Sequence, residues 1–121
     1  MEIWKAFQDI ENGELTLNQY QVLAQRTSAT NNKRDKMVNG LLGLNGEAGE
    51  AIDILKKYWY QGHDLDEDKL LDEASDILWY LAELCTGLGI SMDELARYNV
   101  GKLYRRYPEG FDSDRSVNRE G

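Results

Sequence analysis

The sequence predicts an all-α protein, a bundle of four to five helices, and three observations support this prediction. The chain of 121 residues contains a single proline, Pro108, which is too little turn punctuation for a strand-rich domain. Apolar residues recur at steps of three and four between the turn signals, as they do on one face of a helix. Capping-box patterns at 16–19 and 91–94 mark two helix starts. Because the chain has a mass of 13.9 kDa, which is the size of one domain, we expect residues 1–121 to form a single domain with a polar tail over about 109–121.

The sequence marks the start and end of each predicted helix with capping or turn residues, except for the first helix. Residues 1–14 are ambiguous, and a short helix there would carry its apolar face on Ile3, Trp4, Phe7 and Ile10. The clearer helices that we expect span 17–28, 35–60, 67–87 and 91–107. The segment 28–35 between the first two of these is polar and resembles a loop.

Four glycines follow one another at every third position in the helix expected over 35–60. They are Gly40, Gly43, Gly46 and Gly49. Each glycine weakens a helix by up to about 1 kcal/mol relative to alanine. Two explanations stay open: a loosely formed helix start, or the close approach of a neighbouring helix or ligand.

Composition and charge exclude several function classes. The net charge of −8, from 14 basic and 22 acidic residues, disfavours duplex nucleic acid as a partner. A phosphate ligand remains compatible with this charge if a metal ion lies between the two negative partners. The single cysteine, Cys85, and single histidine, His63, exclude an intrachain disulfide and a zinc site built from these residue types. Because neither a signal peptide nor an apolar run of about 20 residues occurs, we expect a cytoplasmic protein without a membrane partner.

Two pairs of carboxylates on the two central helices are the most informative feature. Glu47 and Glu50 form one pair, and Glu73 and Asp76 form the other, each three residues apart and therefore on one helix face. At about 100° per residue, the first member of each pair points into the apolar stripe of its helix, and the second lies at its edge. The opposite arc of the second helix is polar, including Glu83, except for Trp79, whose position suggests a subunit contact or a ligand wall.

The two pairs lie at matching heights if the central helices form an antiparallel hairpin. Glu50 and Asp76 then lie about 15 Å and 13.5 Å from the turn, at 1.5 Å per residue. Four converging carboxylates would repel one another, and a hard cation such as Mg²⁺, Mn²⁺ or Ca²⁺ would relieve this repulsion. We therefore expect a metal site between these helices. The alternative is that the carboxylates are solvated, as most glutamates on helices are.

Three stretches of the chain resemble the MazG-like nucleoside triphosphate pyrophosphohydrolases. They read GLLGLNGEAGEAIDILKKYWYQGH, LLDEASDILWYLAELCTGLGIS and NVGKLYRRYPEGF, and the similarity extends over about residues 17–119. The combination of E-x-x-E with E-x-x-D and the basic ending is specific. Two departures, Asn45 and the pair Ala74-Ser75, remove no expected ligand.

The resemblance implies an enzyme that hydrolyses a ribo- or deoxyribonucleoside triphosphate to the monophosphate and pyrophosphate. It implies Mg²⁺ as the cofactor, with Mn²⁺ as a substitute, and a homodimer or dimer of dimers. By position, the expected metal ligands are Glu47, Glu50, Glu73 and Asp76. Glu47 and Glu50 are also the expected catalytic residues. The substrate-binding residues implied are Tyr80, Asn99, Lys102 and Arg106.

Other interpretations of these residues and of the function stay open. Lys102 and Arg106 also suit a solvated basic helix end, and Asn99 also suits a buried structural hydrogen bond. The substrate can instead be phosphoribosyl-ATP or one specific deoxynucleotide, because the sequence does not show which base is bound. A non-catalytic helical interaction module is the alternative from another class.

Overall fold

The computed structural model describes residues 3–118, which form helices and no strand, so the predicted all-α class is confirmed. The six helices are α1 (Ile3–Glu11), α2 (Leu17–Gln25), α3 (Lys33–Tyr60), α4 (Glu67–Leu88), α5 (Met92–Arg106) and α6 (Ser113–Val117). The count exceeds the prediction because α6 forms within the expected polar tail, where the Asp112 side chain caps its first turn. The side chains of Trp4 and Phe7, predicted to line α1, lie outside the described residues.

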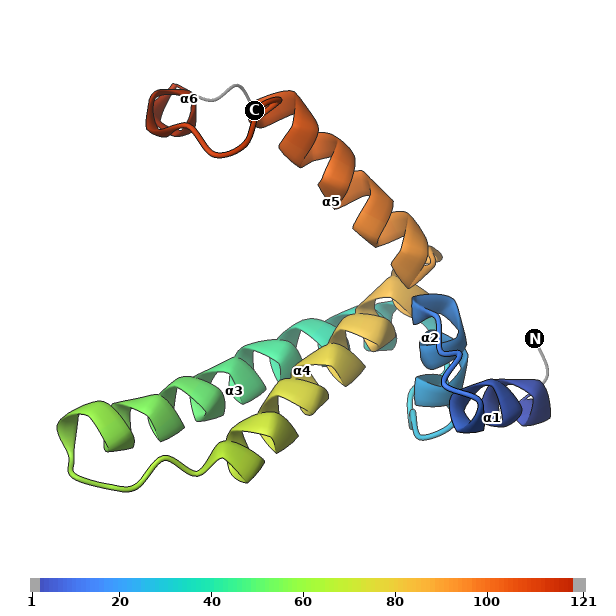
Figure 1. Ribbon diagram of the computed structural model, residues 1–121. Helices are drawn as coiled ribbons and strands as arrows, with labels where there is room; N and C mark the ends of the chain where they lie inside the picture. The colour runs from blue at the N-terminus through green and yellow to red at the C-terminus, as the bar shows by residue number, and fades with distance from the viewer. Residues whose placement is uncertain (1–2, 119–121) are drawn as a thin grey trace.

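Helices α3 and α4 form a long antiparallel hairpin that dominates the molecule (Figure 1). Asn32 caps α3 by accepting a hydrogen bond from Asp35 N at 2.9 Å, and Asp66 caps α4 by accepting one from Lys69 N at 3.0 Å. Gly62 in the connecting loop has a φ of 73°, a backbone conformation that glycine adopts without steric cost. The hairpin thus places the two predicted carboxylate pairs on facing helices.

The glycines of α3 divide into two kinds. A Cβ atom at Gly40 would lie 2.8 Å from the backbone nitrogen of Leu84, and one at Gly43 would lie 2.1 Å from the ring of Tyr80. Gly46 and Gly49 have open space at the same position, with no atom within 4 Å. Close approach of a neighbouring helix therefore explains the first two glycines and not the last two.

A small core joins α2 to the far end of the hairpin. Its buried members are Ala24, Ala82, Cys85 and Met92. Trp79 packs against this core, and its indole Nε1 donates hydrogen bonds to Ala24 O at 3.0 Å and Thr27 Oγ1 at 2.9 Å. The arc of α4 that carries Trp79 is therefore covered by α2 of the same chain.

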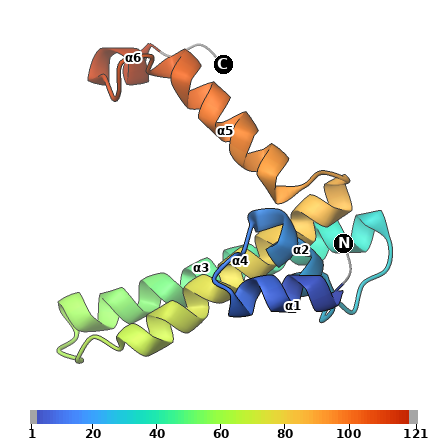
Figure 2. The same ribbon diagram turned by 45° about the vertical axis from the view of Figure 1, so that its right-hand side comes forward.

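Helix α5 leaves the hairpin at Gly89 and extends away from it (Figures 1 and 2). Only its start is anchored by α2, since Met92 N donates to Gln21 Oε1 at 2.8 Å and Asp93 N donates to Asn18 Oδ1 at 3.0 Å. Further along α5, Tyr98 is 70% exposed and Tyr104 is 69% exposed. Large apolar side chains on the hairpin are also exposed, among them Leu42, Ile52, Trp59 and Leu71. Within residues 3–118, no helix combines the length and apolar character that a membrane span requires.

Candidate metal centre

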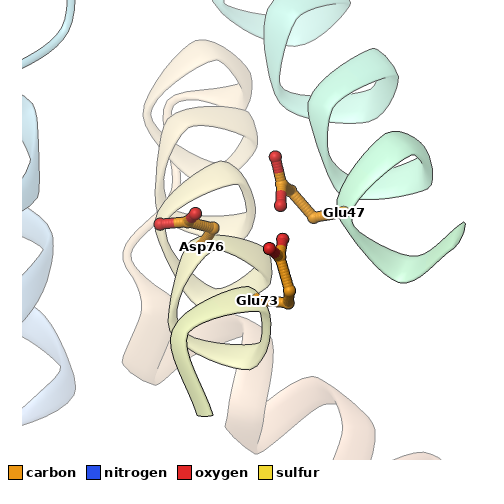
Figure 3. Close-up of side chains that lie close together, drawn as sticks. All are labelled: Glu47, Glu73 and Asp76. Atoms are coloured by element: carbon orange, nitrogen blue, oxygen red, sulfur yellow. The ribbon is translucent and has the colours of Figure 1, made fainter. Parts of the chain in front are cut away.

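Three of the four predicted ligands meet between the two helices of the hairpin. Glu47 on α3 and Glu73 and Asp76 on α4 each offer a carboxylate oxygen, and these oxygens lie within 4.8 Å of one another. Figure 3 shows the carboxyl groups of Glu47 and Glu73 directed toward each other across the hairpin, with Asp76 on the next turn of α4. Glu73 is only 7% exposed. The shared face predicted from the spacing therefore brings carboxylates together at one place.

The electrostatics of this cluster are those of acidic groups held close together. The pKa of Glu73 is raised, first because its carboxyl group can share a proton with Glu47 and second because it is desolvated. The pKa of Glu50 is also raised, chiefly by a hydrogen bond with Glu73 and by repulsion between the two charges. Glu50 thus adjoins the cluster, although it does not share the common centre of the other three.

The donor set fits a divalent cation. The Oε2 atoms of Glu47 and Glu73 are buried and have no hydrogen-bond donor within the described structure. No ion pair found among residues 3–118 involves either of them or Asp76. A set of carboxylate oxygens without a neighbouring cation suits Mg²⁺ or Mn²⁺. These three residues would hold such an ion.

Glu83 on the same helix provides the contrast. It is completely buried, and its carboxylate accepts hydrogen bonds from Asn39 Nδ2 at 2.7 Å, Ser28 Oγ at 2.8 Å, Gln25 Nε2 at 3.0 Å and Thr30 Oγ1 at 3.0 Å. The ammonium group of Lys36 lies 3.5 Å away. Burial alone would raise the pKa of Glu83, but these hydrogen bonds outweigh it and lower the pKa to about 2. A buried glutamate of this chain is therefore ionised where protein donors surround it, whereas the pKa of Glu73 is raised by the acidic side chains of Glu47 and Asp72 and by desolvation.

The sequence analysis assigned Glu83 to the polar arc of the helix, whereas the structure buries this residue completely. The loop after α2 folds over that arc and supplies the hydroxyl groups of Ser28 and Thr30. The lysine and asparagine come from the first two turns of α3. The available signal was the concentration of donor side chains between residues 25 and 39, which periodicity along a single helix does not register.

Of the predicted substrate-binding residues, Tyr80 lies one turn beyond Asp76 on α4, and the other three lie on α5. The ring of Tyr80 packs over Gly43 and meets Trp79 edge-on, with the ring centroids 5.1 Å apart. Asn99 is exposed, so the fold of the single chain gives it no buried structural hydrogen bond. Lys102 and Arg106 are half-buried on α5, the helix that extends away from the hairpin (Figure 1). Their roles toward a nucleotide stay predictions, because the structure does not bring them to the carboxylates of the same chain.

The structure defines an all-α protein in which the two arms of a helical hairpin bring carboxylates together at a candidate metal centre. Residues 36–111 match the model of the MazG nucleotide pyrophosphohydrolase domain, and the chain belongs to this family. The matched segment contains the carboxylate cluster and the whole of α5. The chain is also 29% identical over 109 residues to the gene 37 protein of Mycobacterium phage L5, an alignment that covers 83% of this chain and 96% of the phage protein. No solved structure matches the chain.

Proposed function

We propose that this protein is a Mg²⁺-dependent nucleoside triphosphate pyrophosphohydrolase that converts a (deoxy)nucleoside triphosphate to the monophosphate and pyrophosphate. The observation that supports this proposal most strongly is the cluster of Glu47, Glu73 and Asp76, with its buried oxygens that lack donors. Family membership supplies the reaction class. The −8 charge of the chain would repel a triphosphate, and a divalent cation between them removes this repulsion.

The four carboxylates then divide into two roles. Glu47, Glu73 and Asp76 hold the divalent ion, which when bound would offset phosphate charge and acidify a water molecule. Glu50 adjoins these ligands without sharing their centre, so its carboxylate is the group available to accept the proton of the attacking water. Hydrolysis breaks the anhydride linkage between the α and β phosphates. The bridging oxygen leaves with one product, and the attacking water supplies the oxygen that the other product gains.

A second copy of the chain completes the site in this proposal. Residues 97–106 carry four cationic side chains and no carboxylate, and they belong to a helix that the same chain leaves largely uncovered. The hairpin offers the opposite charge and exposed apolar side chains. Packing α5 of one copy on the hairpin of another would bury both surfaces and bring Asn99, Lys102 and Arg106 to the phosphates. The assembly is then a homodimer or a dimer of dimers.

The proposed reaction is tested with a panel of ribo- and deoxyribonucleoside triphosphates and phosphoribosyl-ATP. We expect pyrophosphate release from at least one of them with Mg²⁺ or Mn²⁺ and none after chelation. Comparable rates across the panel would indicate a general nucleoside triphosphate pyrophosphohydrolase, and a strong preference for one substrate would indicate a specific enzyme. If the panel gives no pyrophosphate while the protein binds Mg²⁺ with unchanged affinity in the presence of nucleotide, a non-catalytic helical module is the correct assignment.

The proposed contribution of the second copy is tested by mixing two inactive variants. Glu73→Gln removes a carboxylate, and Lys102→Ala removes a cation of α5. After subunit exchange, one site of each mixed pair is intact, so we expect recovery of up to about a quarter of the parent activity. Mixtures that stay inactive after exchange, which mass measurement on a tagged copy verifies, would show that α5 does not act on the partner's carboxylates.

A further inference from the structure

A cavity of about 510 Å³ lies at the turn of the hairpin, beside the carboxylate cluster. Glu50 belongs to its wall, together with side chains from the end of α3, from the connecting loop and from the first turn of α4. The cavity is therefore the space into which a ligand bound at the cluster would extend on the side of the turn.

Some charged groups of this cavity already have partners among the described residues, and one lysine does not. Lys57 pairs with Asp53 at 3.1 Å, and Asp66 accepts the backbone hydrogen bond of Lys69 that caps α4. The ammonium group of Lys69 has no ion-pair partner in the described part of the chain. Its charge nevertheless acts on both Glu50 and Asp53. Lys69 is thus the cation of this wall that is free to bind a ligand next to Glu50.

The register of α4 places Lys69 in line with the cluster. Lys69, Glu73 and Asp76 follow one another at steps of four and three and so share one face of the helix. Lys69 lies one turn, about 6 Å along the axis, nearer to the hairpin turn than Glu73. A chain of linked phosphates that starts at the cluster can therefore reach Lys69 if it runs toward the turn.

The walls of the cavity indicate which end of a nucleotide fits it. They consist of charged and polar side chains, including the imidazole of His63, and one apolar side chain, Ile54, and no tryptophan, tyrosine or phenylalanine ring lines them as a platform for a base. Asp64 adds a further carboxylate, which a phosphate group tolerates when it carries a bound Mg²⁺. The cavity therefore suits the phosphate end of a metal-bound nucleotide better than the nucleoside end.

We propose that Lys69 is a phosphate-binding residue that holds the pyrophosphate end of the substrate, so that the triphosphate points toward the hairpin turn and the nucleoside points away from it. This inference rests on the proposed function and adds the orientation of the substrate. It also assigns a cation for the leaving pyrophosphate within the same chain that supplies the carboxylates. Ammonium groups bind phosphate oxygens through charge-assisted hydrogen bonds.

The test compares the binding of inorganic pyrophosphate with that of the nucleoside monophosphate product, by calorimetry with Mg²⁺ present. The parent chain of 121 residues is compared with Lys69→Met, with Lys69→Arg and with Lys56→Met as the control, since Lys56 is exposed on α3 and lies outside the cavity wall. We expect Lys69→Met to weaken pyrophosphate binding at least about tenfold, with monophosphate binding unchanged. Lys69→Arg should restore part of the loss, and Lys56→Met should change neither affinity.

Two results would overturn the orientation that we propose. One is pyrophosphate binding by Lys69→Met at the affinity of the parent. The other is an equal loss for pyrophosphate and monophosphate, which would mean that Lys69 supports the cluster and not one end of the substrate. The nucleotide panel separates this inference from the proposed function: an active parent whose Lys69→Met variant binds pyrophosphate normally retains the proposed reaction and loses only this assignment of Lys69.

Discussion

Replacing Glu73 with glutamine is expected to reduce pyrophosphate release by at least about a thousandfold while leaving the metal-free protein no less stable than the parent. The loss of activity follows because Glu73 contributes a buried oxygen to the only group of three acidic side chains with a common centre found among residues 3–118. The stability is retained because the ionised Glu73 is desolvated and is repelled by Glu47 and Asp72. Thermal melting with and without Mg²⁺ measures the second effect.

The sign of this stability effect follows from proton linkage. The folded state raises the pKa of Glu73 above its ordinary value of 4.5. Between pH 4.5 and the raised pKa, the folded protein therefore holds more protons than the unfolded chain. Ionisation of Glu73 therefore destabilises the metal-free fold as the pH rises through its raised pKa. Glutamine removes this penalty. Mg²⁺ should raise the melting temperature of the parent by mass action and that of Glu73→Gln much less.

Two further variants test this assignment, one beside the three ligands and one as a control on α5. Glu50→Gln should lose turnover but retain the Mg²⁺-dependent rise in melting temperature, because Glu50 lies outside the common centre of the ligands. Glu94→Gln, an exposed change in the first turn of α5, should leave both properties unchanged. Full activity in Glu73→Gln, or an undiminished response of its melting temperature to Mg²⁺, would contradict the assignment of the metal centre.

The hairpin and its cluster could be predicted because both follow from patterns along single helices. The steps of three fix which carboxylates share a face, and the distances from the turn fix their heights, so facing arms bring Glu47 and Glu73 together. The path of α5 could not be predicted in this way. Spacing within α5 shows which residues share its face, but the turn at Gly89 determines where that face points. Lys102 and Arg106 therefore match the family pattern while lying on a helix that leaves the hairpin.

The cover over the polar arc of α4 was missed for a related reason. Burial of Glu83 and Trp79 depends on α2 and the loop that follows it, which are more than fifty residues away in sequence. A helix wheel assigns a charged residue to solvent unless another segment supplies its hydrogen-bond donors. The two glycine pairs of α3 show the same limit, since Gly40 and Gly46 are alike in sequence and differ only in what α4 places beside them.

Replacing Glu83 with glutamine is expected to cost about 3 kcal/mol of unfolding free energy at neutral pH, the largest loss of stability that we expect from one polar substitution in this chain. The lowering of its pKa from 4.5 to about 2 corresponds to this amount at about 1.4 kcal/mol per pH unit. Glutamine also turns an amide donor toward groups that are themselves donors, and Lys36, whose side chain is 15% exposed, loses its counter-charge. Urea denaturation measures the difference.

The same linkage gives this effect a pH window that is opposite in sign to that of Glu73. Because the folded state lowers the pKa of Glu83, its contribution is complete above about pH 4.5 and is lost as the pH falls toward 2. The gap in stability between the parent and Glu83→Gln should therefore shrink in that range. Glu73→Gln serves as the matched control, a change of a buried glutamate on the same helix that should not destabilise the metal-free protein.

Adding Lys36→Met to Glu83→Gln should cost less than the two single losses together, because the ammonium group is already unpaired in the single variant. If Glu83→Gln and Glu73→Gln lowered stability equally, the donors around Glu83 would not distinguish it from the metal centre, and the contrast on which the centre rests would fail.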